Sequence, residues 1–315
     1  MTINDLVTHY VTFRRTLGER CQTNEALLRS FCRSVGPQTP VAGITAAAID
    51  AFLAGGGPVT STWHIRYHAL KGFFRFAVSR GHLDEAPLPA VLPKRPPGFI
   101  PYIYSRDELR RLLDAIPTYR RYRTRIEPET FRAILLTLYG AGLRAREALG
   151  LTVADVDLPK ALLTVRDTKF FKSRLVPIGR DLARMLTEYA HWRDSTHPSA
   201  GGERRFFLGD RGATIHLSTL EDSFRRLREH ARVRRSPEAR YQPRLHDLRH
   251  TFAVHRLTGW YRRGADVRRL IHHLSVYLGH AHLAATQVYL AMTPELLHEA
   301  GSRFERYALG EDDHA

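Results

Sequence analysis

The sequence predicts a mainly α-helical protein of two domains, with a small β-sheet in the second domain, which makes that domain α+β. Apolar residues recur at helical spacing along residues 3–79. A proline-rich segment between Asp84 and Pro101 then separates this helical part from the rest of the chain. Beyond it, two β-prone runs at residues 161–167 and 173–179 interrupt a chain that otherwise has helical periodicity.

Four helices are expected before the proline-rich segment. The periodic runs cover residues 3–18, 27–35, 45–53 and 61–79. The first run ends at Gly18, and the second and third are each followed by a glycine within two residues, which favours a helix end at each place. Because most helical stability in proteins comes from packing of an amphipathic face, we expect these helices to pack together as one compact all-α unit.

The proline-rich segment is the clearest domain boundary. It holds six prolines within 15 residues, which predicts an extended and moderately stiff chain. Ser105 and Glu108 then have the spacing of a capping box that opens a helix. We therefore predict an N-terminal helical domain over residues 1–86, a linker over 87–104 and a second domain over 105–315.

Two segments of the second domain have charged residues at informative positions. Residues 131–158 begin as a buried helix, turn at two glycines and resume as a helix bearing Arg144 and Glu147, which lie close to one helical face. The runs at 161–167 and 173–179 predict a β-hairpin with lysine at its tip. Taken alone, each of these side chains fits an ordinary solvated surface equally well.

The next segment combines a short hydrophobic run with a basic helix. RFFLG, at residues 205–209, is interpreted as a short strand, and residues 217–233 as a helix rich in arginine. The six arginines between residues 225 and 235 are expected to contact a DNA backbone rather than solvent alone.

Composition favours a polyanionic partner and excludes a membrane or secreted class. Lys and Arg outnumber Asp and Glu by 48 to 32, so the net charge is +16 and the pI is near 10.3. Cys21 and Cys32 have no metal-ligand spacing and are expected to be free thiols. With no apolar run of about 20 residues and no signal peptide, we expect a cytoplasmic protein without a membrane partner.

The stretch between residues 245 and 290 holds the strongest chemical signal. His246 and Arg249 are three residues apart in a helix-like run, and His280 and Tyr289 are nine residues apart. Arginine donors fit phosphate oxygens, histidine moves protons and tyrosine can attack phosphorus, so the group predicts a phosphoryl-transfer site. A metal site is the weaker interpretation, because no His-Glu-x-x-His motif occurs. The remaining histidines of the region, His250 among them, are interpreted as surface or packing residues.

His-x-x-Arg, then Leu-Gly-His, then a tyrosine nine residues past that histidine resembles the signature of the tyrosine site-specific recombinases. This family includes phage integrases, Xer-type recombinases and mobile-element transposases. The resemblance extends over residues 105–300. It implies six catalytic residues, which are Arg144, Lys169, His246, Arg249, His280 and Tyr289.

The resemblance also implies a role for each residue. Tyr289 is the expected nucleophile, and Lys169 the expected general acid. Lys172 stays open as the alternative acid, because Phe170 and Phe171 stand where relatives have Gly-rich, polar residues. Neither a metal nor another cofactor is implied.

As a whole, the resemblance implies a SAM-like four-helix DNA-binding domain followed by a tyrosine-recombinase catalytic domain. The expected activity is cutting and rejoining of DNA through a 3′-phosphotyrosine, for integration or excision of a mobile element. The expected partners are double-stranded DNA with specific sites, further copies of the chain as a tetramer on paired sites with a dimer per site, and accessory recombinase subunits. Xer-like resolution of chromosome dimers, type IB topoisomerase activity and a catalytically idle DNA-binding protein stay open as alternatives.

Overall fold

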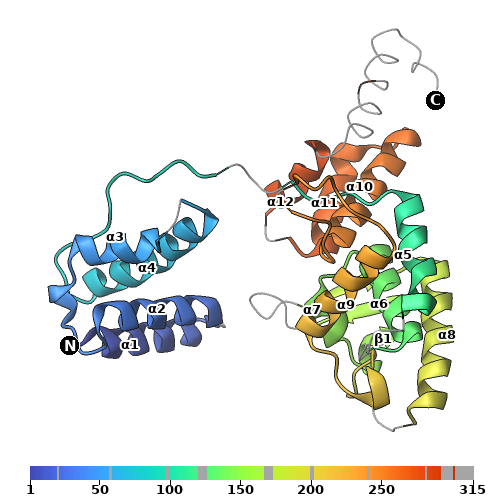
Figure 1. Cartoon of the computed structure of the whole chain (residues 1–315), viewed down its shortest axis with the longest axis horizontal. Helices are drawn as coiled ribbons and strands as arrows, with labels where there is room; N and C mark the ends of the chain where they lie inside the picture. The colour runs from blue at the N-terminus through green and yellow to red at the C-terminus, as the bar shows by residue number, and fades with distance from the viewer. Residues whose placement is uncertain are drawn as a thin grey trace. The chain divides into compact units, whose positions relative to one another are not determined.

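The computed structural model describes residues 1–19, 21–56, 59–96, 100–119, 126–166, 173–198, 202–239, 241–280, 282–291 and 301. The chain divides into an N-terminal unit, Met1–Phe99, and a second unit that begins at Ile100. Helices make up most of both units (Figure 1). In the described residues, no helix is long and apolar enough to cross a membrane.

The N-terminal unit consists of helices around one apolar cluster. They are α1 (Ile3–Thr16), α2 (Gln22–Val35), α3 (Ala46–Ala54) and α4 (Ser61–Ser79), with a short 3-10 helix η1 (Val41–Gly43). Thr2 caps α1 in a capping box with Asp5, and Thr45 caps α3. Helix α4 packs against α1, α2 and α3, so its buried Phe73 and Phe74 lie at the centre of the cluster.

Some arginine side chains of this unit pack against aromatic rings. The Nη1 atom of Arg66 donates to the carbonyl of Phe52 at 2.9 Å, and its guanidinium lies 5.1 Å from the centroid of that ring. Arg80 lies 5.5 Å from the centroid of Phe76. Arg75, on α4, and Arg80, at its C-cap, are both exposed.

The second unit has more helices and a small sheet. Its helices are α5 (Arg106–Tyr119), α6 (Pro128–Gly140), α7 (Ala145–Gly150), α8 (Arg180–Thr196), α9 (Leu217–His230), α10 (Asp247–Arg262), α11 (Val267–Leu278) and α12 (Ala284–Gln287). Short 3-10 helices are η2 (Val153–Asp155), η4 (Asp210–Gly212) and η5 (Val288–Ala291). The capping box of α5 forms as predicted, with Ser105 and Glu108 exchanging hydrogen bonds of 2.8 and 3.1 Å.

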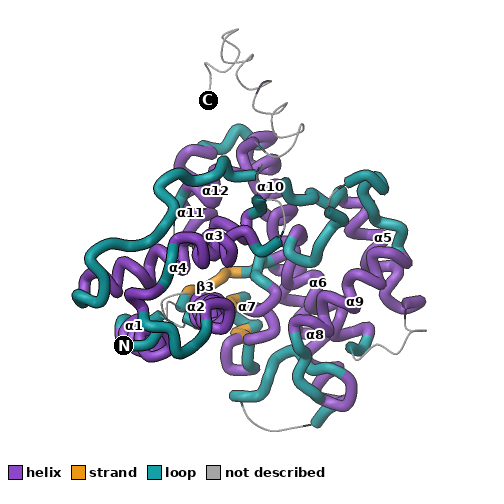
Figure 2. The backbone as a smooth tube through the Cα atoms, turned by 60° about the vertical axis from the view of Figure 1, so that its left-hand side comes forward, coloured by secondary structure: helices purple, strands orange, loops and turns teal. Residues whose placement is uncertain are grey.

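Three short antiparallel strands form the sheet in the order β1 (Val156–Asp157), β2 (Leu162–Val165), β3 (Arg174–Pro177). Figure 2 draws the strands in orange and labels β3. Leu163 pairs with Val176, and both side chains are buried. The predicted hairpin and the predicted fold class, mainly helical with a small sheet, are confirmed. The predicted strand at 205–209 is wrong: Arg205 makes one bridge to Thr152, and Phe206 and Phe207 pack on Tyr189 instead of joining a ladder.

Helix α6 forms the centre of the second unit. It packs against α5, α7, α8 and α10, and its apolar residues, such as Ile134 and Leu138, are buried. Helix α10 in turn contacts α11 and η5. A second apolar cluster forms there and includes Phe252, Leu274 and Tyr289. Packing of α10 therefore brings the His-x-x-Arg segment and the distant tyrosine together.

Candidate active site

Arg144 stands at the N-terminus of α7, where a neighbouring carboxylate holds it. Glu147 accepts the backbone N–H of Arg144 at 2.9 Å and its Nη1 at 2.7 Å. The prediction that this helix contains Arg144 is wrong by one residue, because Arg144 is its N-cap in extended conformation. The arginine side chain is 39% exposed, so its other donors can reach a ligand.

Arg249 lies in α10 and has a side chain that is only 2% exposed. Its Nη1 donates to the carbonyl of Gly142 at 2.7 Å, and its Nη2 to the carbonyl of Leu278 at 2.5 Å. Gly142 has φ of +61°, and a Cβ there would lie 2.5 Å from the Phe252 ring, so this carbonyl position requires glycine. Burial, followed by the charge of Arg144, lowers the pKa of Arg249 to about 10, which leaves it charged at neutral pH.

Glu147 is surrounded by three guanidinium groups. Its carboxylate oxygens lie 2.7 Å from Arg144, 2.8 Å from Arg174 and 3.8 Å from Arg249. Arg174 also donates from Nε to the carbonyl of Tyr277 at 3.0 Å. Burial alone would raise the pKa of Glu147, but the hydrogen bonds and charge of Arg174 outweigh it and lower the pKa to about 2. Three cations around one anion leave the cluster positive, which favours binding of a phosphodiester.

Acid is expected to destabilise the second unit through Glu147. Its folded-state pKa of about 2 lies below the ordinary value of 4.5. The carboxylate therefore contributes stability that is fully present above pH 4.5 and is lost as the pH falls through about 2. A shift of this size corresponds to about 3 kcal/mol of the free energy of unfolding.

Urea unfolding measured across this pH window checks the expectation. Wild type is expected to lose stability steeply, and Glu147→Gln, which has no charge to lose, to decline less. Equal slopes in the two proteins would show that Glu147 does not carry the acid sensitivity.

Three imidazoles line the site. His246 is the exposed N-cap of α10. His250 follows one turn later, and the two rings meet edge to face with centroids 4.8 Å apart. His280 follows Gly279 at the end of α11, and its Nδ1 pairs with the hydroxyl of Thr286 at 2.7 Å. Desolvation, then nearby positive charges, lowers the pKa of His250 to about 3 and that of His280 to about 4, so both are neutral at physiological pH.

Tyr289 lies in η5 and is 3% exposed. Its hydroxyl is 3.1 Å from Nδ1 of His250, and its ring stacks on His280 with centroids 6.1 Å apart. Burial raises the pKa of Tyr289, while the charges of Arg249 and Arg144 act in the opposite direction. The phenol therefore keeps its proton at neutral pH and must lose it to become a nucleophile.

The described residues bring five of the six predicted catalytic residues into one cluster: Arg144, His246, Arg249, His280 and Tyr289. The sixth, Lys169, and its competitor Lys172 belong to residues 167–172, which lie outside the described residues. In the ranges that the structure describes, no group of three or more His, Cys, Asp or Glu is arranged to hold a metal ion.

Three residues of this cluster were given no role from the sequence. Arg174 contacts Glu147, Thr286 contacts His280, and His250 contacts Tyr289. His250, which was interpreted as a surface or packing residue, does pack on the rings of His246 and Tyr289, and it also forms a hydrogen bond with the phenol. The spacing of His246 and His250, one helical turn apart, was the available signal that both face the same site.

A protonated tyrosine beside neutral imidazoles and forked cationic donors has the groups that an enzyme of the phosphoryl-transfer class requires. The chain matches the model of the phage integrase family over residues 104–295. It is 33% identical over 307 residues to the integrase/recombinase y4rB of Sinorhizobium fredii, covering 97% of this chain and 98% of that one. The tyrosine recombinase XerA of Thermococcus kodakarensis is 34% identical over 232 residues, which cover 74% of this chain and 71% of XerA.

The chain therefore belongs to the phage integrase family. It is a tyrosine recombinase, an enzyme that cuts and rejoins DNA in site-specific recombination.

Solved structures share the fold. The integrase of transposon Tn1549 in complex with transposon right end DNA has a TM-score of 0.70 at 18% identity, and the match covers 98% of this chain and 100% of that one. A lambda integrase tetramer bound to a Holliday junction has a TM-score of 0.64 at 16% identity, covering 92% of this chain and 77% of that one.

Proposed function

We propose that this recombinase breaks a DNA strand by attack of Tyr289 on a phosphodiester, which forms a 3′-phosphotyrosyl bond and releases a 5′ hydroxyl. The observation that carries the proposal is the position of the phenol, 3.1 Å from an imidazole nitrogen and next to buried Arg249. A second strand's 5′ hydroxyl then attacks the phosphotyrosyl bond and completes the exchange. Because the intermediate conserves the energy of the broken bond, the cycle needs no nucleotide hydrolysis.

Each member of the cluster has a role in this cycle. Arg144 and Arg249 donate to the non-bridging oxygens and stabilise the charge that grows in the transition state. His280 donates a hydrogen bond to the phosphate from Nε2, because Thr286 occupies its Nδ1. His246 assists proton transfer at Tyr289, and Lys169 protonates the leaving 5′ oxygen.

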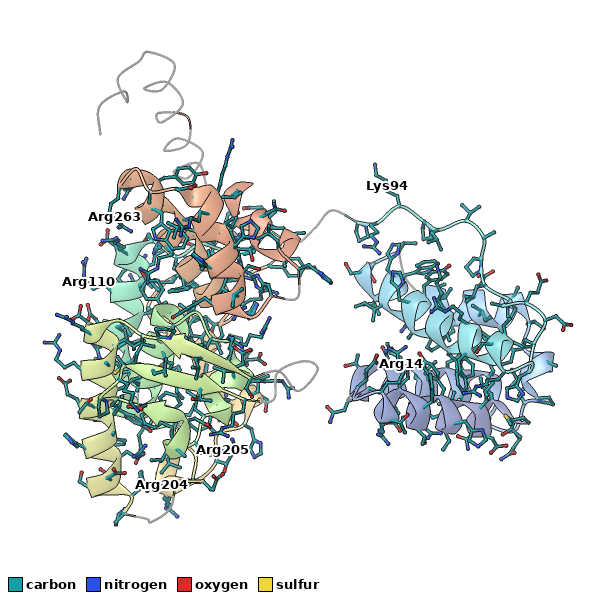
Figure 3. The ribbon with its side chains drawn as sticks, turned by 180° about the vertical axis from the view of Figure 1, so that it is seen from behind. Arg14, Lys94, Arg110, Arg204, Arg205 and Arg263 are labelled. Carbon is teal, nitrogen blue, oxygen red and sulfur yellow. The ribbon has the colours of Figure 1, made fainter. Side chains whose placement is uncertain are left out.

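DNA binding is proposed to involve both units. Lys94 of the N-terminal unit, and Arg110 and Arg263 of the second unit, extend from the surface (Figure 3). The net charge of +16 makes binding strongly dependent on salt. Two arginines of the predicted DNA-contacting group form hydrogen bonds within the protein instead. Arg228 is buried and donates to the carbonyl of Pro243, and Arg235 donates to the carbonyl of Pro101.

The domain roles follow from the same proposal. Residues 1–86 hold one side of the recombination site, residues 87–104 link the two domains, and residues 105–315 carry the chemistry. Strand exchange takes place in a tetramer on paired sites, with a dimer on each site. The amphipathic pattern past Pro294 predicts a terminal helix that packs either on a neighbouring subunit or on its own domain. Residues 292–300 and 302–315 lie outside the described residues.

The biological reaction is proposed to be integration or excision of a mobile element. Support comes from the similarity over nearly the full length of both chains to a protein described as an integrase/recombinase. Xer-like resolution of chromosome dimers is the second candidate, supported by the 34% identity to XerA over a shorter region.

A recombination assay tests the proposal. The protein is incubated with plasmids that carry one or two copies of the junction sequence from the ends of the element in which its gene lies. We expect recombinant products only from the two-site plasmid, and a covalent protein–DNA complex on a nicked duplex with the same sequence. Relaxation of supercoils without paired sites would indicate topoisomerase activity instead, and exchange only at a chromosomal dimer-resolution sequence would favour the Xer-like role.

A further inference from the structure

The hydroxyl of Tyr289 has an imidazole neighbour that the recombinase signature does not include. Its oxygen lies 3.1 Å from Nδ1 of His250, with the two ring centroids 5.6 Å apart. This separation is within the roughly 2.6–3.2 Å over which a base can take a proton directly. His246, the histidine of the signature, contacts the ring of His250.

Exposure distinguishes the two histidines. His246 is exposed, His250 is half-buried and Tyr289 is buried. A buried phenol can pass its proton directly only to a group that touches it, and His250 does so from inside the site. His246 touches the ring of His250 and not the phenol, so the assistance of His246 to proton transfer passes through His250.

We propose that His250 is a catalytic residue, which accepts the proton of Tyr289 during strand cleavage and returns it during rejoining. The inference rests on the proposed function of Tyr289 as nucleophile. In the step, a lone pair of Tyr289 Oη forms the bond to phosphorus while the bond from phosphorus to the 5′ oxygen breaks and its electron pair leaves with that oxygen. The phenolic proton moves to Nδ1 of His250, and the leaving oxygen takes a proton from the general acid, expected at Lys169, so charge and protons balance.

The charges around His250 make its basicity depend on the substrate. His246 and Arg249 face it from α10, Arg244 from the segment before that helix, His280 from the end of α11 and Tyr289 from η5. Desolvation, followed by the charges of His246, Arg244, Arg249 and His280, holds the pKa of His250 at about 3 in the free protein. A phosphodiester bound by the arginines adds a negative charge, which raises the pKa of His250 toward the working pH. The base is therefore strengthened only when a phosphate is in place.

Single-turnover cleavage of the nicked duplex tests this role. His250→Asn places an amide oxygen where Nδ1 was, so it can accept the hydrogen bond but not the proton. At pH 7 we expect the rate of covalent-complex formation to fall about 100-fold. The rate of this variant should then rise about tenfold per pH unit, because hydroxide must remove the proton, whereas the wild-type rate levels off once His250 is neutral.

His246→Gln is the matched control. Its cleavage rate is expected to level off with rising pH as the wild-type rate does, whatever the absolute rate of this variant. A plateau in His250→Asn together with its loss in His246→Gln would overturn the proposal and assign the base to His246. Formation of the covalent complex by wild type tests the proposed function of Tyr289 as nucleophile. Its failure can therefore be distinguished from a failure of the proposed role of His250. Thermal melts of both variants establish that they are folded.

A measurement without DNA tests the hydrogen bond between the Tyr289 hydroxyl and Nδ1 of His250. Nitrogen-15 NMR of histidine-labelled protein is expected to show His250 neutral, with its proton on Nε2 and Nδ1 free to accept. Tyr289→Phe should shift the Nδ1 resonance of His250 and leave that of exposed His272 unchanged. A proton on Nδ1 would make His250 a donor to the phenol and would overturn the proposal.

Discussion

Replacing Tyr289 with phenylalanine is expected to abolish the covalent protein–DNA complex. The substitution removes one oxygen, and that oxygen is the proposed attacking atom. The ring is 3% exposed and packs with Phe252 and Leu274, so a phenylalanine of nearly the same volume retains the apolar contacts. Loss of the hydrogen bond to His250 should cost about 1 kcal/mol of stability. The variant is therefore expected to fold and to bind DNA in a gel-shift assay while forming no covalent band.

Tyr277→Phe provides the matched control. Tyr277 is part of the same apolar cluster, stacks on Phe252 at 5.6 Å and donates its hydroxyl to the carbonyl of Pro177 at 3.0 Å. Since that hydroxyl has a structural partner away from the imidazoles, its removal should leave covalent-complex formation within about threefold of wild type, as expected for one hydrogen bond. A covalent band that persists in Tyr289→Phe and disappears in Tyr277→Phe would move the nucleophile to Tyr277.

Arg249→Lys is expected to lower the rate of covalent-complex formation about 1,000-fold while retaining the positive charge. The guanidinium of Arg249 bridges the carbonyls of Gly142 and Leu278 with two separate donors. A lysine ammonium has no rigid fork to span them, so one buried carbonyl loses its partner at about 1–3 kcal/mol. Loss of the planar donors also weakens binding of the phosphate in the transition state.

Single-turnover kinetics and urea unfolding, measured on the same preparation, separate the effect of Arg249→Lys on the cleavage rate from its effect on stability. The control is Arg256→Lys on the same helix, where the exposed guanidinium lies 5.4 Å from the centroid of Phe252. This exposed substitution should change stability by less than about 0.5 kcal/mol. A wild-type cleavage rate in Arg249→Lys would show that the forked donors of Arg249 are not required.

Local patterns were enough to predict the four helices of the N-terminal unit and the hairpin, but not α8 and α11 of the second unit. The capping box at Ser105 and Glu108 and the alternation in Leu162–Val165 depend on neighbours in sequence, and both form as predicted. Some helix starts were misjudged: α2 begins at Gln22, five residues before the predicted run, and α7 and α10 each begin one residue later than expected. Arg144 and His246 occupy the N-caps of α7 and α10, and neither residue type is a usual cap, so periodicity alone placed them inside the helices.

Long-range contacts account for what the sequence did not reveal at the site. Arg174 of β3 meets Glu147 of α7, a partner 27 residues away in the sequence, so no local pattern reveals the contact. His250 meets Tyr289 across 39 residues through the packing of α10 on η5. A hydrophobic run such as Phe206 and Phe207 fits a strand and a buried loop equally well, and only its packing on Tyr189 decides between them.

The most direct test of the account is to identify the amino acid that carries the DNA. Wild-type protein is trapped on the nicked duplex, digested with nuclease and protease, and the nucleotide-bearing peptide is sequenced by mass spectrometry. We expect a single adduct on Tyr289, joined to the 3′ phosphate of the cut strand. An adduct on Tyr277 or any other residue, or a link to a 5′ phosphate, would contradict it.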